Sequence, residues 1–136
     1  DRADFRDPAL FPEGTRFAPL PPFDGRHGDY GGGHLEPFAA REIYAAVVSR
    51  CWETDCAAVA ALAERRPPRL RYLGLMGSRR KIERVVEEVE GRGLSLAGLP
   101  LRAPIGLPIG GDAPGEIAIG VLAEVLQSRY RREESS

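Results

Sequence analysis

The stretch that decides the fold is Leu70–Val89, LRYLGLMGSRRKIERVVEEV. Its first part, Leu70–Met76, is an apolar run that stops at Gly77, which is typical of a strand buried in a parallel sheet. The second part is amphipathic, and its apolar residues recur at the spacing of one helical face: Ile82, Val85, Val86 and Val89. The stretch therefore predicts a strand, a glycine turn and a helix.

A similar unit precedes this stretch. Ile43–Ser49 is a short, mostly apolar run of β-branched and aromatic residues, and it predicts another buried parallel strand. The alanine-rich segment after it favours a helix, with Thr54 as the expected N-cap and Asp55 in the first turn. The pair Pro67-Pro68 ends that helix.

A connector and a last helix follow. We expect Gly91 or Gly93 to end the middle helix with a left-handed cap. Residues 94–112 form an irregular connector rich in Gly and Pro. Asp112 is expected to cap the last helix, Glu116 to about Arg131, which is apolar on most sides and so predicts packing against a sheet. The order of elements predicts an α/β fold with a parallel sheet.

The chain of 136 residues suits one domain, with 43% hydrophobic residues available for a core. We expect residues 1–42 to be its irregular N-terminal part and residues 43–136 to hold the strands and helices. Within the N-terminal part, a short helical turn is expected near Pro8–Phe11 and a short strand near Thr15–Ala18.

The charge balance excludes some classes of protein. Lys plus Arg total 19 and Asp plus Glu total 20, so the net charge of −1 argues against a nucleic-acid-binding protein, which needs a basic face. No apolar run approaches the roughly 20 residues that span a bilayer, and the first residues lack a signal-peptide pattern. Two cysteines are too few for a disulfide scaffold, so a cytoplasmic protein is expected.

Three cations, Arg79, Arg80 and Lys81, stand where the middle helix begins. A helix N-terminus is electropositive, so each cation there costs a few tenths to about 1 kcal/mol. Nearby glutamates can offset that cost, or a bound anion such as phosphate can. Because ligands of open α/β sheets bind at the carboxyl ends of the strands, this turn is a candidate anion site, with a solvated basic turn as the alternative.

Other candidates lie at the end of the first strand. Cys51 and Cys56 suggest zinc together with His27 and His34, but small buried cysteines are the simpler interpretation. Cys51 is the better placed thiol for contacting a ligand. Next to it, Trp52 suits either stacking on a flat ring or covering the sheet edge. Glu53 and Asp55 suit either an acid/base pair or the first turn of a helix, and we favour the helical role.

Two motifs carry a family resemblance. Gly74–Lys81, GLMGSRRK, and Ala103–Gly110, APIGLPIG, followed by Pro114–Ala118, PGEIA, closely resemble the hallmarks of the xanthine dehydrogenase accessory factor family (XdhC/CoxI). VVSRCWETD and DRADFRDPALFP also resemble segments of its C-terminal domain. The resemblance covers nearly the whole chain and implies a Rossmann-like, three-layer open parallel sheet.

The resemblance also implies a function. Members are associated with binding the molybdenum cofactor, supporting its sulfuration and delivering it to a molybdenum hydroxylase such as xanthine dehydrogenase. We therefore expect a non-enzymatic chaperone, with a cysteine desulfurase and a second copy as further partners. The expected cofactor-binding residues occupy three segments: Cys51 and Trp52; Gly77, Ser78, Arg79, Arg80 and Lys81; and Ile105, Gly106 and Gly110.

The chain departs from the family pattern at its N-terminus. The family domain opens with a strand and a glycine-rich turn resembling G-x-G-H, and this chain begins after both, so we expect a sheet incomplete at that end. An NAD(P)-dependent oxidoreductase of the Rossmann type is the alternative function. The missing glycine fingerprint counts against it, because that turn holds the pyrophosphate.

Overall fold

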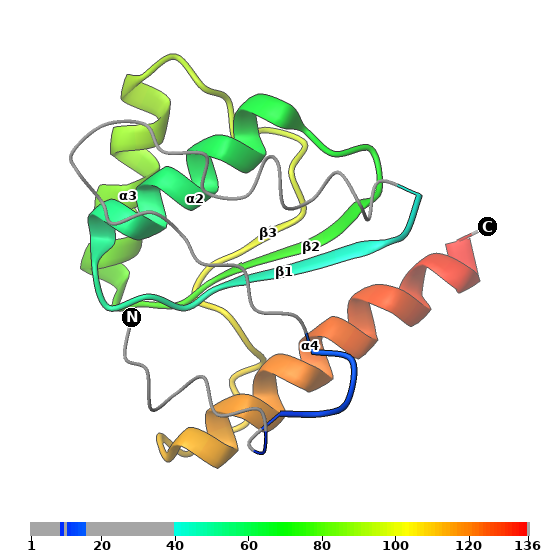
Figure 1. The fold of residues 1–136 in the computed structure, drawn as a ribbon. Helices are drawn as coiled ribbons and strands as arrows, with labels where there is room; N and C mark the ends of the chain where they lie inside the picture. The colour runs from blue at the N-terminus through cyan, green and yellow to red at the C-terminus, as the bar shows by residue number, and fades with distance from the viewer. Residues whose placement is uncertain (1–8, 10, 16–39, 136) are drawn as a thin grey trace.

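The computed structural model describes residues 9, 11–15 and 40–135. Within these residues three strands and three helices alternate: β1 (Ile43–Val47), α2 (Trp52–Arg65), β2 (Leu70–Leu75), α3 (Arg79–Gly91), β3 (Leu101–Arg102) and α4 (Pro114–Ser135). Figure 1 shows α2 and α3 on one face of the sheet and α4 on the other. The predicted α/β fold with three layers is confirmed.

The three strands form one parallel sheet in the order β1-β2-β3. Ile43 is paired with Leu70, and Leu73 is paired with Leu101. Among the described residues the sheet is open, with β1 and β3 as its edges. The strand β3 was not predicted, because its two residues lie in a connector dominated by Gly and Pro.

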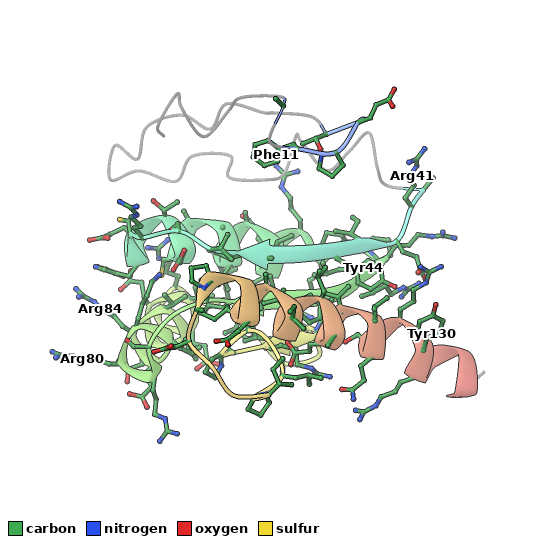
Figure 2. The ribbon with its side chains drawn as sticks, turned by 90° about the horizontal axis from the view of Figure 1, so that it is seen from below. Phe11, Arg41, Tyr44, Arg80, Arg84 and Tyr130 are labelled. Carbon is green, nitrogen blue, oxygen red and sulfur yellow. The ribbon has the colours of Figure 1, made fainter. Side chains whose placement is uncertain are left out.

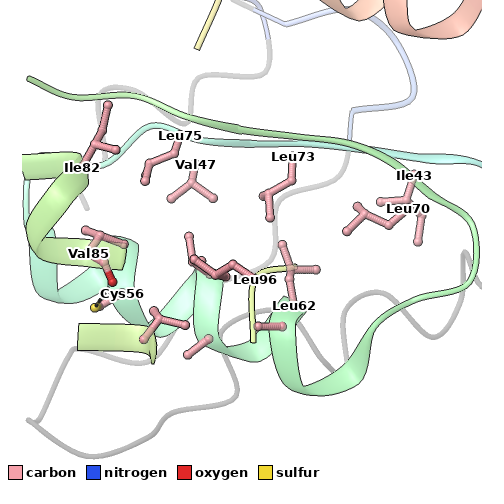
Figure 3. Packing of buried hydrophobic residues seen from close by; sticks show 14 residues of the cluster. Ile43, Val47, Cys56, Leu62, Leu70, Leu73, Leu75, Ile82, Val85 and Leu96 are labelled. Carbon is pink, nitrogen blue, oxygen red and sulfur yellow. Dashed lines mark hydrogen bonds between the residues drawn. The ribbon is translucent and has the colours of Figure 1, made fainter. Parts of the chain in front are cut away.

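The core lies between the sheet and the pair α2 and α3. Successive side chains of a strand point to opposite faces, so Leu73 and Leu75 of β2 face these helices. In Figure 3 they point toward Cys56, Leu62 and Val85, which are buried on the helices. Full burial of one such leucine contributes roughly 1.5–3 kcal/mol, which stabilises the packing of β2 against the two helices.

The helix starts differ from the predicted ones. Asp55 N–H donates to the carbonyl of Cys51 at 3.1 Å, so α2 begins before Thr54 and its N-cap residue is Cys51. Ile117 N–H donates to the carbonyl of Ala113 at 3.0 Å, so α4 begins at Pro114 without Asp112 as its cap. In both places the first backbone hydrogen bond of the helix starts before or after the residue with the preferred capping side chain, Thr54 or Asp112.

The other boundaries are close to the predicted ones. The helix α3 ends at Gly91, and Gly93 has the expected left-handed backbone with φ of +79°. The helix α4 continues to Ser135, beyond the expected end at Arg131. Thr15 is not part of a strand, and the rest of the expected strand near it lies outside the described residues. Of the helical turn expected near Pro8–Phe11, Pro8 and Leu10 lie outside the described residues.

The helix α4 packs against the sheet, as predicted, but with one face only. Its contacts reach β2 and the loop before the helix. The opposite face is apolar and exposed: Ile119 is 60%, Leu122 62% and Leu126 50% accessible to solvent. The helix is apolar on two sides, and the sheet of the described residues covers one of them.

A buried acid joins α4 to the sheet and to the loop at residues 103–111. One carboxylate oxygen of Glu124, Oε2, accepts the Tyr72 hydroxyl at 2.5 Å and the Gly106 N–H at 2.8 Å. Burial, followed by the hydrogen bond to Glu124, raises the pKa of Tyr72. We call this three-residue cluster the Glu124 clamp.

No helix among the described residues is long and apolar enough to cross a membrane.

The Glu124 clamp predicts how stability changes at alkaline pH. The pKa of Tyr72 in the folded chain lies above its ordinary value of 10.0, so its contribution is complete below pH 10 and falls above it, where the unfolded chain loses the proton first. Tyr72→Phe should flatten the loss of unfolding free energy above about pH 10, measured by urea unfolding. At neutral pH it should cost about 1–3 kcal/mol, because Glu124 loses a donor. Tyr130→Phe on the exposed face is the matched control, and an equal flattening there would contradict the assignment.

Candidate functional site

The predicted site segments meet at one end of the sheet. In Figure 1, α2, α3 and α4 all start at this end, where the parallel strands finish. Cys51 and Trp52 follow β1, and the turn Gly77–Lys81 follows β2, its direct neighbour in the sheet. Two of the three predicted segments, Cys51–Trp52 and Gly77–Lys81, therefore lie at the same end of the sheet, and we call this region the rim.

A buried ion pair holds the two segments together. The carboxylate of Asp55, on α2, is fully buried, and its Oδ2 lies 2.5 Å from Lys81 Nζ at the start of α3. The ammonium also donates to the carbonyl of Ser49 at 2.8 Å and to that of Met76 at 3.4 Å. The ion pair and these two hydrogen bonds surround the ammonium with three oxygen atoms. Lys81 thus links the segments that follow β1 and β2.

The other oxygen of Asp55 fixes the loop after β1. Oδ1 accepts the Ser49 hydroxyl at 2.5 Å and the Ser49 N–H at 3.3 Å. Asp55 Oδ2 makes no hydrogen bond among the described residues, which leaves the Lys81 ammonium as its counter-charge there. Asp55 is therefore a structural residue, as the helical interpretation favoured, and its partner Lys81 was not predicted.

Both glycines of the GLMGSRRK motif stand where a larger side chain would clash with a neighbouring residue. A Cβ at Gly77 would lie 2.8 Å from Lys81 Cδ, in the path of the side chain that reaches Asp55. A Cβ at Gly74 would collide with Ile105, whose side chain crosses the strand there. Ser78 is the N-cap of α3 and accepts the Lys81 N–H at 3.3 Å. Gly77 and Ser78 thus support the position of Lys81, and Gly74 makes room for Ile105 of the second motif.

The two arginines of the turn, unlike Lys81, are exposed to solvent. Arg79 and Arg80 are exposed in the first turn of α3, which contains no acidic residue. Neither forms an ion pair with a described residue. Figure 2 shows Arg80 projecting from this end of the molecule, with Arg84 one turn further along the helix. Two guanidinium groups that have no acidic partner among the described residues form a site of positive potential at this helix N-terminus.

The aromatic ring of this rim is already covered on one side. The Arg84 guanidinium lies 3.7 Å from the centre of the Trp52 ring, a cation–π contact. Trp52 is half-buried, as the covering role predicts. Stacking on a ligand would use its other face or would displace Arg84.

The two cysteines differ. Cys51 is exposed, and its thiol donates to Glu53 Oε2 at 2.6 Å. That hydrogen bond is the main reason why the pKa of Glu53 lies below its ordinary value. Cys56 is buried, and burial raises the pKa of its thiol. The buried interpretation is therefore confirmed for Cys56 and wrong for Cys51. Within the described part of the chain no three His, Cys, Asp or Glu side chains gather in a metal-binding arrangement, and His27 and His34 lie outside it.

The second predicted motif lines a pocket of about 390 Å³ next to the start of α4. Ile105, Gly106 and Gly110 belong to its wall, and no residue of the Gly77–Lys81 turn does. Ile105 N–H donates to the Leu75 carbonyl at 2.9 Å, which ties this loop to the end of β2. The structure thus brings the third segment to the same end of the sheet, but as a separate concave surface.

Two acids of α4 were missed by the sequence analysis. Glu116 lines the pocket, and Glu124 holds the loop through Gly106. A usable signal existed for Glu124. It lies three and four residues after Val121 and Gly120, which face the loop, so helical spacing places it on the packed face.

Comparison with known proteins gives partial matches to longer proteins. The chain is 44% identical over 57 residues to the uncharacterized protein YqeB of Escherichia coli (strain K12), a match covering 41% of this chain and 10% of that protein. It is 39% identical over 64 residues to a protein of Bacillus subtilis (strain 168) named as a probable subunit of xanthine dehydrogenase, covering 46% and 17%. The chain therefore spans a minor part of these relatives.

A solved structure shares the fold. The crystal structure of a xanthine dehydrogenase from Bacillus halodurans superposes with a TM-score of 0.56 at 23% identity, over 76% of this chain and 29% of that one. The model of the XdhC Rossmann domain matches residues 1–125, which include both motifs, the buried ion pair and the pocket. The chain therefore belongs to the XdhC Rossmann-domain family.

Proposed function

We propose that this chain binds the molybdenum cofactor and acts as an accessory protein of a molybdenum hydroxylase such as xanthine dehydrogenase. The observation that carries the proposal is the unequal use of three cations: Lys81 is neutralised inside the protein, whereas Arg79 and Arg80 remain exposed at the electropositive start of α3. The family membership and the name of the Bacillus subtilis relative point to the same class of partner.

The chemistry of the turn fits a phosphate group. Guanidinium groups bind phosphate through paired, charge-assisted hydrogen bonds, and the helix dipole adds to the attraction. In this proposal Arg79 and Arg80 hold the cofactor's phosphate, while Lys81, which was among the expected contacts, positions them. Ser78 keeps its role as the N-cap, so its hydroxyl serves the helix.

Cys51 and Trp52 complete the proposed rim. The exposed thiol of Cys51 follows β1, and β1 is the neighbour of β2, the strand that leads into the turn with the two arginines. Support for sulfuration and delivery of the cofactor, with a cysteine desulfurase and a second copy as partners, belongs to the same proposal. When bound, the cofactor would supply the molybdenum chemistry, and this chain would supply binding and orientation.

A retention experiment tests the proposal. The full chain is mixed with molybdopterin released from a molybdoenzyme and passed through a gel-filtration column, and the retained pterin is measured by its fluorescence after oxidation. Arg79→Ala plus Arg80→Ala should lower the retained pterin by at least about tenfold, because each charge-assisted bond contributes about 1.5–3 kcal/mol. Arg92→Ala, at the other end of α3, should leave retention unchanged.

Equal retention by the wild-type chain and the double variant would refute this site. NADH binding by the wild-type chain, without retention of molybdopterin, would favour the oxidoreductase alternative.

The unequal use of the cations also predicts unequal effects on stability. Lys81→Met or Asp55→Asn should each lower the unfolding free energy by about 3–5 kcal/mol, because a buried charge loses its partner. The double variant should cost less than the sum, since neither charge is then left alone. Arg79→Ala should change stability by no more than about 0.5 kcal/mol. Urea unfolding measures all four, and a Lys81→Met variant as stable as Arg79→Ala would contradict the buried pair.

A further inference from the structure

The pocket beside α4 has the character of a small-molecule site. Its volume of about 390 Å³ lies in the usual range of ~300–1,000 Å³. Most of its wall is apolar and comes from the loop after β3, with Ile117 of α4 closing one side. Two of the wall's large side chains are exposed, Ile109 at 56% and Ile117 at 38%, so a flat apolar ligand would cover surface that the described residues leave in water.

Among the described residues, Glu116 is the one ionisable side chain that lines this pocket. Its Oε2 accepts the Ala113 N–H at 3.2 Å, which holds the carboxylate in place at the start of α4. Gly111 faces it, and a Cβ at that position would collide with the carboxylate. A carboxylate has about four acceptor positions, and the Ala113 contact uses one. The pocket therefore offers an exposed carboxylate, anchored through one oxygen, beside an apolar wall.

This combination selects for a particular hydrogen-bonding edge. A carboxylate accepts two neighbouring N–H groups but repels an edge that presents an acceptor. The 2-amino-4-oxopyrimidine ring, common to pterins and guanine, has a ring N–H next to an amino group and so matches both oxygens. Adenine places a ring acceptor next to its amino group and does not match.

We propose that this pocket binds a 2-amino-4-oxopyrimidine ring, with Glu116 accepting its ring N–H and its amino group. The assignment rests on the proposed function, because it places the pterin of the cofactor in the pocket and its phosphate at Arg79 and Arg80. Guanine is the second source of the same chemistry, and the experiment separates the two.

The test compares ligands that differ in the amino group. The full chain is titrated with pterin and with lumazine, which carries oxygen in place of the 2-amino group, and with guanosine and inosine, by equilibrium dialysis. The wild-type chain should prefer pterin over lumazine by about tenfold or more, as a paired base-edge contact does. Glu116→Gln should reduce that ratio to within about twofold, because an amide offers only one acceptor oxygen. A preference for guanosine over inosine that exceeds the pterin preference would identify guanine as the ligand.

Two controls separate binding from folding. Glu116→Gln keeps an oxygen for the Ala113 N–H, so its melting temperature and helical circular dichroism should match the wild type. Ile109→Ser, on the exposed wall, should weaken pterin and lumazine alike and leave their ratio unchanged. The proposal is overturned if the wild-type chain binds none of the four ligands, or if Glu116→Gln keeps the wild-type ratios.

Failure of this inference and failure of the proposed function give different results. Retention of molybdopterin that depends on Arg79 and Arg80 but not on Glu116 would overturn the pocket assignment alone. A Glu116-dependent preference for pterin or guanosine, without any retention of molybdopterin, would overturn the accessory function and leave the pocket as a site for the ring.

Discussion

A fully buried carboxylate, Asp55, sits where two neighbouring strands end, and it is stable there only because a positive charge reaches it. Lys81 comes from the next helix and carries that charge across the end of the sheet. The same ammonium donates hydrogen bonds to the carbonyl of Ser49 after β1 and to that of Met76 after β2. The arrangement of the whole rim follows from this contact, because α2, α3 and the two turns before them cannot move apart without exposing an unpaired ion.

This constraint explains why the basic turn has the sequence GSRRK. The glycine makes room for the lysine side chain, the serine caps the helix, and the lysine forms the ion pair with Asp55. Arg79 and Arg80 have no such structural duty among the described residues, and they stand where backbone N–H groups are also free. A turn that is rigid through its lysine can therefore present its arginines in a fixed geometry, which is what recognition of an anion requires.

Local patterns in the sequence were enough for the order of β1, α2, β2, α3 and α4, because each element has a clear period or apolar run. Contacts between distant segments were not readable. The pairing of Asp55 with Lys81 spans two motifs, and in the sequence Asp55 has a sufficient local role in a first turn. Cys51 was misjudged as a buried residue for a similar reason, since exposure at the end of a strand depends on the neighbouring helix. The site was thus predicted at the level of segments, while the division of tasks within each segment needed coordinates.

The Glu124 clamp makes α4 and the loop before it a single cooperative unit. One oxygen atom is shared between a hydroxyl of β2 and a backbone amide of the loop, which lie 52 and 18 positions away along the chain. If the helix detached from the sheet, both bonds would be lost together, and the wall of the neighbouring cavity would lose its support. Thermodynamic linkage then has a consequence for binding. A molecule that binds in the cavity only while the 22-residue helix is docked also stabilises the docked state against opening.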